Sequence, residues 1–140
     1  VNKLSSKLNR RIKLLIGKPG LDGHSSGAEQ IAVASRDIGM EVVYEGIRLT
    51  PQQIVNTAIE ESVHMIALSI LSGSHLSLTS EVIKLMKKNN LSLPLIVGGI
   101  IPPEDEKKLL KLGVSRIYTP KNYDIKSIMD DFVSILEKFY

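Results

Sequence analysis

The stretch that decides the fold is HMIALSIL, residues 64–71, which is apolar from Met65 to Leu68. An apolar run of this length is typical of a strand in the middle of a parallel sheet, because helices cover both faces of such a sheet. The polar run Ser72–His75 follows and predicts the loop by which the chain leaves the strand. Residues 64–71 are therefore expected to form the third and most buried strand of an α/β domain.

Short apolar runs alternate with amphipathic segments along the whole chain, as in repeated strand–helix units. The other predicted strands are residues 12–16, 41–45, 95–97 and 116–118. Helices are predicted between the strands and after the last one, with Gly39 and Gly113 as left-handed caps and Asp124 as an N-cap. Thr50-Pro51-Gln52-Gln53 predicts a capping box. The buried stripe of its helix is expected to be Ile54, Val55, Ala58 and Ile59.

Right-handed crossovers among five such units predict one doubly wound, flavodoxin-like (Rossmann-like) domain with helices on both faces. Its five-stranded parallel sheet is expected to have the order 2-1-3-4-5. Residues 11–140 are assigned to this domain and residues 1–10 to a basic leader. Ligands bind such sheets at the carboxyl ends of the strands, near the switch point between strands 1 and 3.

The amino-acid composition excludes several classes of site and partner. The 140 residues include no cysteine, which excludes thiolate metal sites and thiol catalysis, and only three histidines, His24, His64 and His75. His64 begins a strand and is interpreted as a packed structural residue. The net charge of +3 is too small to indicate a nucleic-acid partner. With no apolar run long enough to span a membrane and no signal peptide, the expected location is the cytoplasm.

The sequence leaves the role of the basic leader open. The leader is either a solvated segment or an arm that docks RNA or a subunit.

The loop at 17–27 does not match the usual phosphate-binding loops, because neither GxxxxGK[ST] nor the dinucleotide fingerprint is present. A receiver domain would place a carboxylate after the third strand, and a flavodoxin would need aromatic flanks for its ring. This chain has no such carboxylate, and only 4% of its residues are aromatic.

That loop does carry Asp22-Gly23-His24-Ser25-Ser26-Gly27, an Asp-x-His-x-x-Gly motif. Further blocks follow at the ends of later strands: Ser69-x-Leu71, Gly73-Ser74-His75, and Gly98-Gly99 before Ile100-Ile101-Pro102-Pro103. On these residues the chain resembles the cobalamin-binding domain of the methylmalonyl-CoA mutase family of acyl-CoA carbon-skeleton mutases. The resemblance covers residues 9–136.

The resemblance implies adenosylcobalamin as the cofactor and His24 as the lower axial ligand of its cobalt. Imidazole suits cobalt, and Asp22 is positioned to accept its other ring N–H, with Lys18 keeping that carboxylate charged and placed. These three residues are the implied catalytic group. The implied cofactor contacts are Asp22, Gly23, His24, Ser25, Gly27, Ser69, Leu71, Gly73, His75, Gly98, Gly99 and Thr119.

Within that set, the resemblance implies that Ser69 bonds the benzimidazole nitrogen and that Leu71 packs on the face of the base. Gly27, Gly98 and Gly99 would leave room for the nucleotide tail. His75 either caps the following helix or approaches the corrin edge. Related domains often have a Gly-Pro-Gly-like turn after the fifth strand, where this chain reads Tyr118-Thr119-Pro120, so Thr119 is the remaining donor there.

The family's acyl-CoA site lies in a (β/α)₈ barrel of roughly 250 residues, which this chain cannot contain. The expectation is therefore an isomerase small subunit, inactive alone, that supports a radical 1,2-rearrangement on a separate barrel subunit. An excised domain is the other explanation. Methylmalonyl-CoA, isobutyryl-CoA and 2-hydroxyisobutyryl-CoA are not distinguished as substrates. The alternatives are a corrinoid carrier for methyl transfer, which usually has a helical cap domain, and a cofactor-free interaction module on the same fold.

Overall fold

A computed structural model describes residues 12–17, 26–44, 50–70, 75–99, 101–119 and 124–140. In these residues strands and helices alternate as predicted. The strands are β1 (Lys13–Gly17), β2 (Glu41–Tyr44), β3 (Met65–Ile70), β4 (Leu95–Gly99) and β5 (Arg116–Tyr118). The helices are α2 (Ser26–Asp37), α3 (Pro51–Glu61), α4 (His75–Lys88), α5 (Pro103–Leu112) and α6 (Ile125–Phe139).

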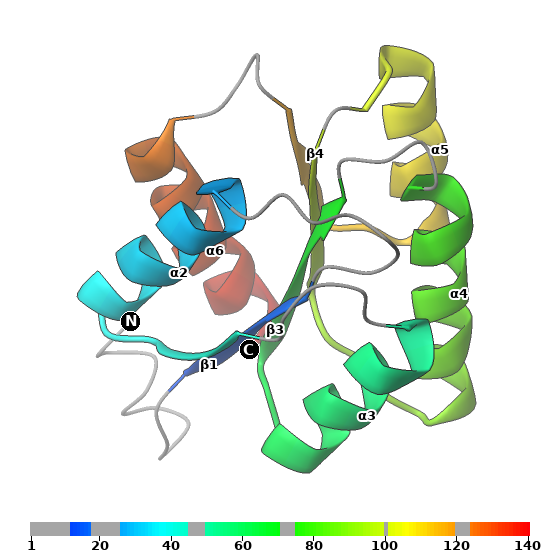
Figure 1. Cartoon of the computed structure of the whole chain (residues 1–140), viewed down its shortest axis with the longest axis horizontal. Coiled ribbons are helices and arrows are strands. Elements are labelled where there is room, and N and C mark those ends of the chain that lie inside the picture. Colours follow the sequence, from blue (N-terminus) through cyan, green and yellow to red (C-terminus); the bar gives the residue numbers. More distant parts are fainter. Residues whose placement is uncertain (1–11, 18–25, 45–49, 71–74, 100, 120–123) are drawn as a thin grey trace.

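The described strands form one parallel sheet in the order β2-β1-β3-β4-β5, which confirms the predicted topology. Figure 1 shows the two helical layers: α2 and α6 cover one face of the sheet, and α3, α4 and α5 cover the other. The carboxyl ends of all five strands therefore lie at one edge of the sheet. None of the helices that the structure describes is long and apolar enough to cross a bilayer.

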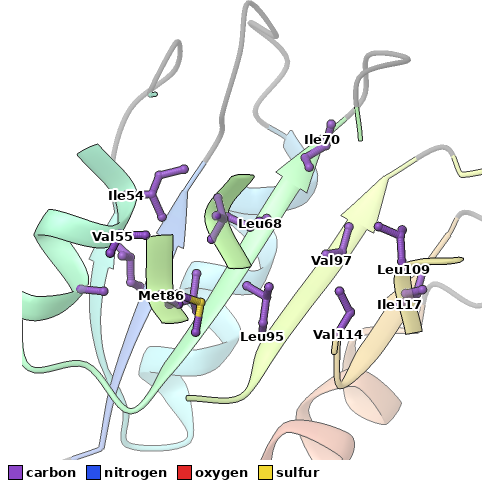
Figure 2. Close-up of a cluster of buried hydrophobic side chains, with 14 of the residues drawn as sticks. Ile54, Val55, Leu68, Ile70, Met86, Leu95, Val97, Leu109, Val114 and Ile117 are labelled. Carbon is purple, nitrogen blue, oxygen red and sulfur yellow. The ribbon is translucent and has the colours of Figure 1, made fainter. Parts of the chain in front are cut away.

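Each helical layer has its own apolar core against the sheet. Under α3, α4 and α5, side chains such as Leu68, Val97 and Leu109 pack together (Figure 2). Under α2 and α6, the cluster includes Ala67 and Phe132. Alternation along the strands produces this division, because successive side chains point to opposite faces. Each fully buried aliphatic or aromatic side chain contributes about 1.5–3 kcal/mol to stability. The two cores therefore stabilise the sheet and fix the position of its carboxyl edge.

The predicted helix ends are mostly confirmed. At the start of α3, Thr50 Oγ1 accepts from the Gln53 amide at 3.1 Å and Gln53 Oε1 accepts from the Thr50 amide at 2.8 Å, so the capping box is complete. Gly39 and Gly113 have φ angles of 102° and 118°, as left-handed caps require. Asp124 is the N-cap of α6 but caps no backbone amide, because its carboxylate accepts from the Ser127 hydroxyl at 2.7 Å instead.

The prediction that Ile59 belongs to the core is wrong. Ile59 of α3 is 43% exposed, whereas Ile54, Val55 and Ala58 of the same stripe are buried. Ile59 borders an open cavity of about 550 Å³ at the amino edge of the sheet, where Leu91 and Tyr140 form other parts of the wall. The cavity leaves the side chain of Ile59 partly open to solvent, so the buried stripe of α3 ends at Ala58.

Several predicted boundaries also move by one or two residues. β1 is shifted by one residue, β3 begins one residue later than predicted, and β4 includes the two glycines that were expected to follow it. The predicted last residue of β3, Leu71, lies outside the described residues. His75, predicted as part of the exit loop, is the first residue of α4.

Candidate functional site

The candidate site lies at the carboxyl edge of the sheet, where β1, β3, β4 and β5 end side by side. Seven of the predicted site residues fall outside the described residues, so their roles stay predictions: Lys18, Asp22, Gly23, His24, Ser25, Leu71 and Gly73. Gly27 belongs to the first turn of α2. His75 belongs to the first turn of α4. The site is thus built here from the strand ends.

Ser69, Gly98 and Tyr118 form one row across three neighbouring strands. Ser69 of β3 pairs with Gly98 of β4, and Gly98 pairs with Tyr118 of β5. Tyr118 belongs to the core under α2 and α6, and residues paired across a parallel sheet share a face. Ser69 and Gly98 therefore face the α2/α6 layer. The sequence had placed Ser69 and Gly98 at this edge, and the register now brings them together.

The two adjacent glycines of β4 have different reasons to be glycine. A Cβ built on Gly99 would lie 1.7 Å from the carbonyl oxygen of Ile70, so the close approach of β3 and β4 requires glycine there. A Cβ on Gly98 would meet only the Tyr118 carbonyl oxygen within 4 Å, at 3.8 Å. Packing among the described residues leaves this position open. A group that rests against the sheet would need that space.

Tyr118 is the functional candidate that sequence reasoning missed, since it was predicted only as part of a short edge strand. Its hydroxyl donates to Asp131 Oδ2 of α6 at 2.8 Å, and Arg116 Nη2 lies 3.3 Å from the same oxygen. Burial, together with the hydrogen bond to the Asp131 carboxylate, raises the pKa of Tyr118 well above its ordinary value. The hydrogen bond to Asp131, called here the Asp131 clamp, holds the neutral phenol ring of Tyr118 beside the open position at Gly98. No local signal could have found it, because the register that pairs Tyr118 with Gly98 depends on the tertiary structure.

Thr119 directly follows Tyr118 and is partly exposed. It lies at the carboxyl edge because β5 ends one residue before it. The structure therefore keeps Thr119 at the same edge as Ser69 and Gly98, directly after the strand that neighbours β4.

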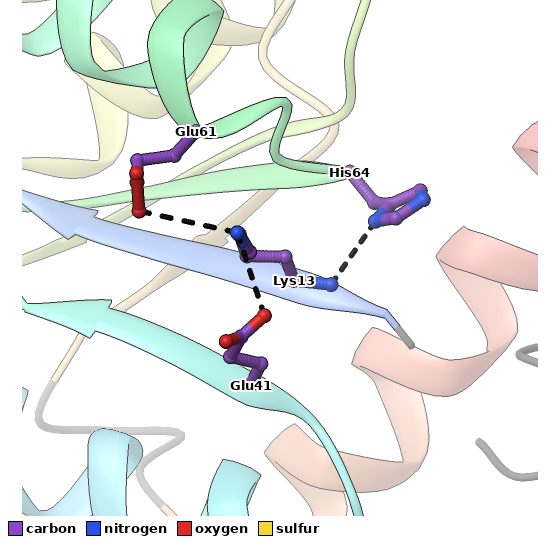
Figure 3. Close-up of polar contacts among 4 residues, drawn as sticks. All are labelled: Lys13, Glu41, Glu61 and His64. Atoms are coloured by element: carbon purple, nitrogen blue, oxygen red, sulfur yellow. Dashed lines mark hydrogen bonds and ion pairs between the residues drawn. The ribbon is translucent and has the colours of Figure 1, made fainter. Parts of the chain in front are cut away.

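His64 lies at the opposite, amino edge of the sheet and has structural contacts. Its Nδ1 accepts from the Lys13 amide at 3.0 Å, and its backbone oxygen accepts from the Tyr140 hydroxyl at 2.8 Å. The Lys13 ammonium pairs with Glu41 at 3.4 Å and Glu61 at 3.9 Å (Figure 3). His64 is 5% exposed, which confirms its interpretation as a packed residue.

The donor set at the carboxyl edge fits a cofactor with a planar tail. The described part of the row offers the Ser69 hydroxyl, a space beside Gly98 that a side chain would fill, and the ring of Tyr118, whose own hydroxyl is bonded to Asp131. A flat group could lie in that space, between the Ser69 hydroxyl and the Tyr118 ring. The fold and this site define a cofactor-binding α/β domain of the flavodoxin-like class.

Comparison with known proteins identifies the particular family. The B12 binding domain family matches residues 12–122, and the chain belongs to it, in the form found in acyl-CoA mutases. Its cofactor is therefore cobalamin. The chain is 51% identical over 138 residues to the ethylmalonyl-CoA mutase of Cereibacter sphaeroides, covering 99% of this chain and 21% of that protein. The chain thus spans about a fifth of that relative's length.

Another relative has nearly the same size. The 2-hydroxyisobutanoyl-CoA mutase small subunit of Aquincola tertiaricarbonis is 41% identical over 121 residues, which is 84% of this chain and 89% of that subunit. Among solved structures, a cobalamin-binding protein from Desulfitobacterium hafniense superposes with a TM-score of 0.69 at 21% identity, over 83% of this chain and 60% of that one. This last likeness supports the fold. The resemblance found in the sequence motifs is confirmed.

Proposed function

We propose that this chain is the cobalamin-binding small subunit of an adenosylcobalamin-dependent acyl-CoA mutase. The observation that carries this proposal is the 41% identity to a mutase small subunit over 89% of its length. The acyl-CoA substrate would be held by a separate (β/α)₈-barrel subunit, as the likeness to a mutase small subunit suggests. The chain would therefore contribute cofactor binding to an isomerase and have no activity alone.

His24 is the proposed metal ligand. It would bind cobalt through one ring nitrogen, while Asp22 would accept the N–H of the other. This hydrogen bond would hold the imidazole in a single tautomer and orientation and make it a better ligand. Lys18 would keep Asp22 ionised and in place through its positive charge.

The nucleotide tail is proposed to lie against the sheet at Ser69 and Gly98. The Ser69 hydroxyl would donate to the benzimidazole nitrogen, and Leu71 would cover one face of the base. The space for the tail is at Gly98, whereas Gly99 shapes the strand end by its close contact with Ile70. Gly23, Ser25, Gly27, Gly73, His75 and Thr119 complete the proposed cofactor contacts.

Bound adenosylcobalamin supplies the radical chemistry of a 1,2-rearrangement, and the protein supplies binding, orientation and exclusion of water. In this division of roles, the residues of this chain act on the cofactor and not on the acyl group. The identity of the acyl-CoA would therefore be decided by the barrel subunit.

Electron paramagnetic resonance of the chain loaded with cob(II)alamin tests the proposal. If His24 is the ligand, the spectrum shows nitrogen superhyperfine splitting that changes when histidine is labelled with nitrogen-15. The His24→Ala variant is the control and should lose the label-dependent splitting. A spectrum that is insensitive to the label, with the cofactor's own base coordinated, would contradict the assignment.

A further inference from the structure

Two buried side-chain oxygens among the described residues have no hydrogen-bond partner: the hydroxyls of Tyr44 and Thr79. Burying a hydroxyl without a partner costs free energy, so such atoms are rare in folded proteins and each one calls for an explanation. The two differ in location. Thr79 belongs to α4, on the face of the sheet away from α2 and α6.

Tyr44 lies on the face of the sheet where the cofactor site is proposed, on the outer strand β2, two strands from Ser69 of β3. It is the last residue of β2 and pairs with Ile16, one residue before β1 ends. Its side chain packs in the core under α2 and α6, the same layer that Ser69 and Gly98 face. The orphan hydroxyl of Tyr44 is therefore at the carboxyl edge of the sheet and on the cofactor side, whereas the Thr79 hydroxyl is in the opposite layer.

The hydroxyl of Tyr44 is suited to donate and not to ionise. Burial raises its pKa, and the negative charge of Glu29 in the first turn of α2 raises it further. Glu29 is near enough to influence the charge of the phenol but makes no hydrogen bond to it. A neutral phenol in this position has a proton to donate to an acceptor outside the described residues.

We infer that Tyr44 is a further cofactor-binding residue, whose hydroxyl donates a hydrogen bond to an oxygen of bound cobalamin. The inference rests on the proposed function and adds a strand, β2, to the site that β1, β3, β4 and β5 form. Cobalamin presents oxygen acceptors in two places, the amide groups around the corrin ring and the phosphate and sugar of its tail. Either source provides the same chemistry, and the experiment separates them.

The first measurement uses the cofactor-free chain and two variants, Tyr44→Phe and Thr79→Val. Each substitution removes an unpartnered hydroxyl and keeps the shape of the side chain. Circular dichroism melts should therefore show that neither variant unfolds at a lower temperature than the wild type. A clear fall in melting temperature for Tyr44→Phe would show that the hydroxyl has a partner within the protein, which would overturn the inference.

The second measurement is affinity for cobalamin and for cobinamide, which lacks the nucleotide tail, by equilibrium dialysis with the corrin absorbance as readout. Tyr44→Phe should bind cobalamin about 2–12-fold more weakly, as expected for one neutral hydrogen bond, and Thr79→Val should bind like the wild type. Weaker binding of both corrinoids places the acceptor on the corrin amides, and weaker binding of cobalamin alone places it on the tail.

Two outcomes of the binding measurement separate a failure of this inference from a failure of the proposed function. A wild-type chain that binds cobalamin, with Tyr44→Phe equal to it for both corrinoids, overturns this inference alone. A wild-type chain that binds no cobalamin contradicts the proposed function itself.

Discussion

Gly98 and Gly99 are neighbours in one strand, but substitutions at them should have opposite consequences. The Cβ of a residue at position 99 would overlap the backbone of Ile70, whereas position 98 is open toward the α2/α6 layer. The sequence shows only a pair of glycines. The contacts separate a residue that the backbone needs from one that a ligand would need.

We predict that Gly98→Val keeps the fold and weakens cobalamin binding roughly 5-fold to 150-fold, the effect of about 1–3 kcal/mol of steric conflict. Gly99→Ala should instead destabilise the cofactor-free chain by at least about 2 kcal/mol, because strand backbone must move. Urea unfolding and cobalamin titration of both variants provide the check. Equal loss of stability in the two variants would remove the distinction.

Tyr118 illustrates how a single residue links stability to pH. Its raised pKa means that the folded chain keeps the phenol proton at pH values where the unfolded chain loses it. The stability contributed by its hydrogen bond to Asp131 is thus complete below about pH 10 and is lost as the pH rises further.

Tyr118→Phe should therefore cost about 1 kcal/mol near neutral pH, and the difference from wild type should shrink as the pH rises above about 10. The measurement is urea unfolding of both chains at several pH values up to the alkaline limit of reversibility. Asp131 is partly exposed, which is why the lower range of hydrogen-bond values applies. A difference that stays constant with pH would argue against the Asp131 clamp as its source.

At the scale of elements, α3 has a completely defined start. Its capping box satisfies two backbone amides with the side chains of Thr50 and Gln53. Proline at the first helical position adds a preset backbone angle. These features were readable from the sequence because a capping box is a local interaction between residues three apart.

We expect Thr50→Ala to destabilise the chain by about 0.5–2 kcal/mol through loss of this cap. Gln52→Ala is a matched control one residue from Gln53, since it removes only an exposed hydrogen bond to Asn56, of 2.8 Å. Its cost should stay below about 0.5 kcal/mol. Chemical denaturation compares the two, and a control variant as unstable as Thr50→Ala would contradict the assignment.

At the scale of the whole molecule, most of the two cores lies away from the cofactor edge, which the core under α2 and α6 meets at Tyr44 and Tyr118. The two apolar clusters lie along the body of the sheet, and the open position at Gly98 lies at its carboxyl edge. Substitutions in the loop that carries His24 should therefore affect cofactor binding more than folding.

This separation makes a prediction for the proposed subunit. The purified chain should bind cobalamin but show no isomerase activity with any acyl-CoA until a barrel subunit is added. His24→Ala should weaken cofactor uptake and assembly, while its melting temperature stays within about 2 °C of the wild type. Acyl-CoA turnover by the chain alone, or full activity of the His24→Ala complex, would contradict this account.

Much of this protein was determined by local sequence. Strand and helix positions, the α3 capping box and the glycine caps at Gly39 and Gly113 follow from hydrophobic period and turn chemistry, which depend on residues a few positions apart. The strand order also followed, because right-handed crossovers leave few topologies for five such units. The family motif then indicated the cofactor.

Other features depend on contacts between residues far apart in the chain, and only the tertiary structure decided them. Strand register placed Ser69, Gly98 and Tyr118 in one row. Ile59 borders an open cavity and is exposed, although its spacing alone predicted burial. The unpartnered hydroxyl of Tyr44 could not be predicted, because whether a buried polar atom is satisfied depends on every element packed around it.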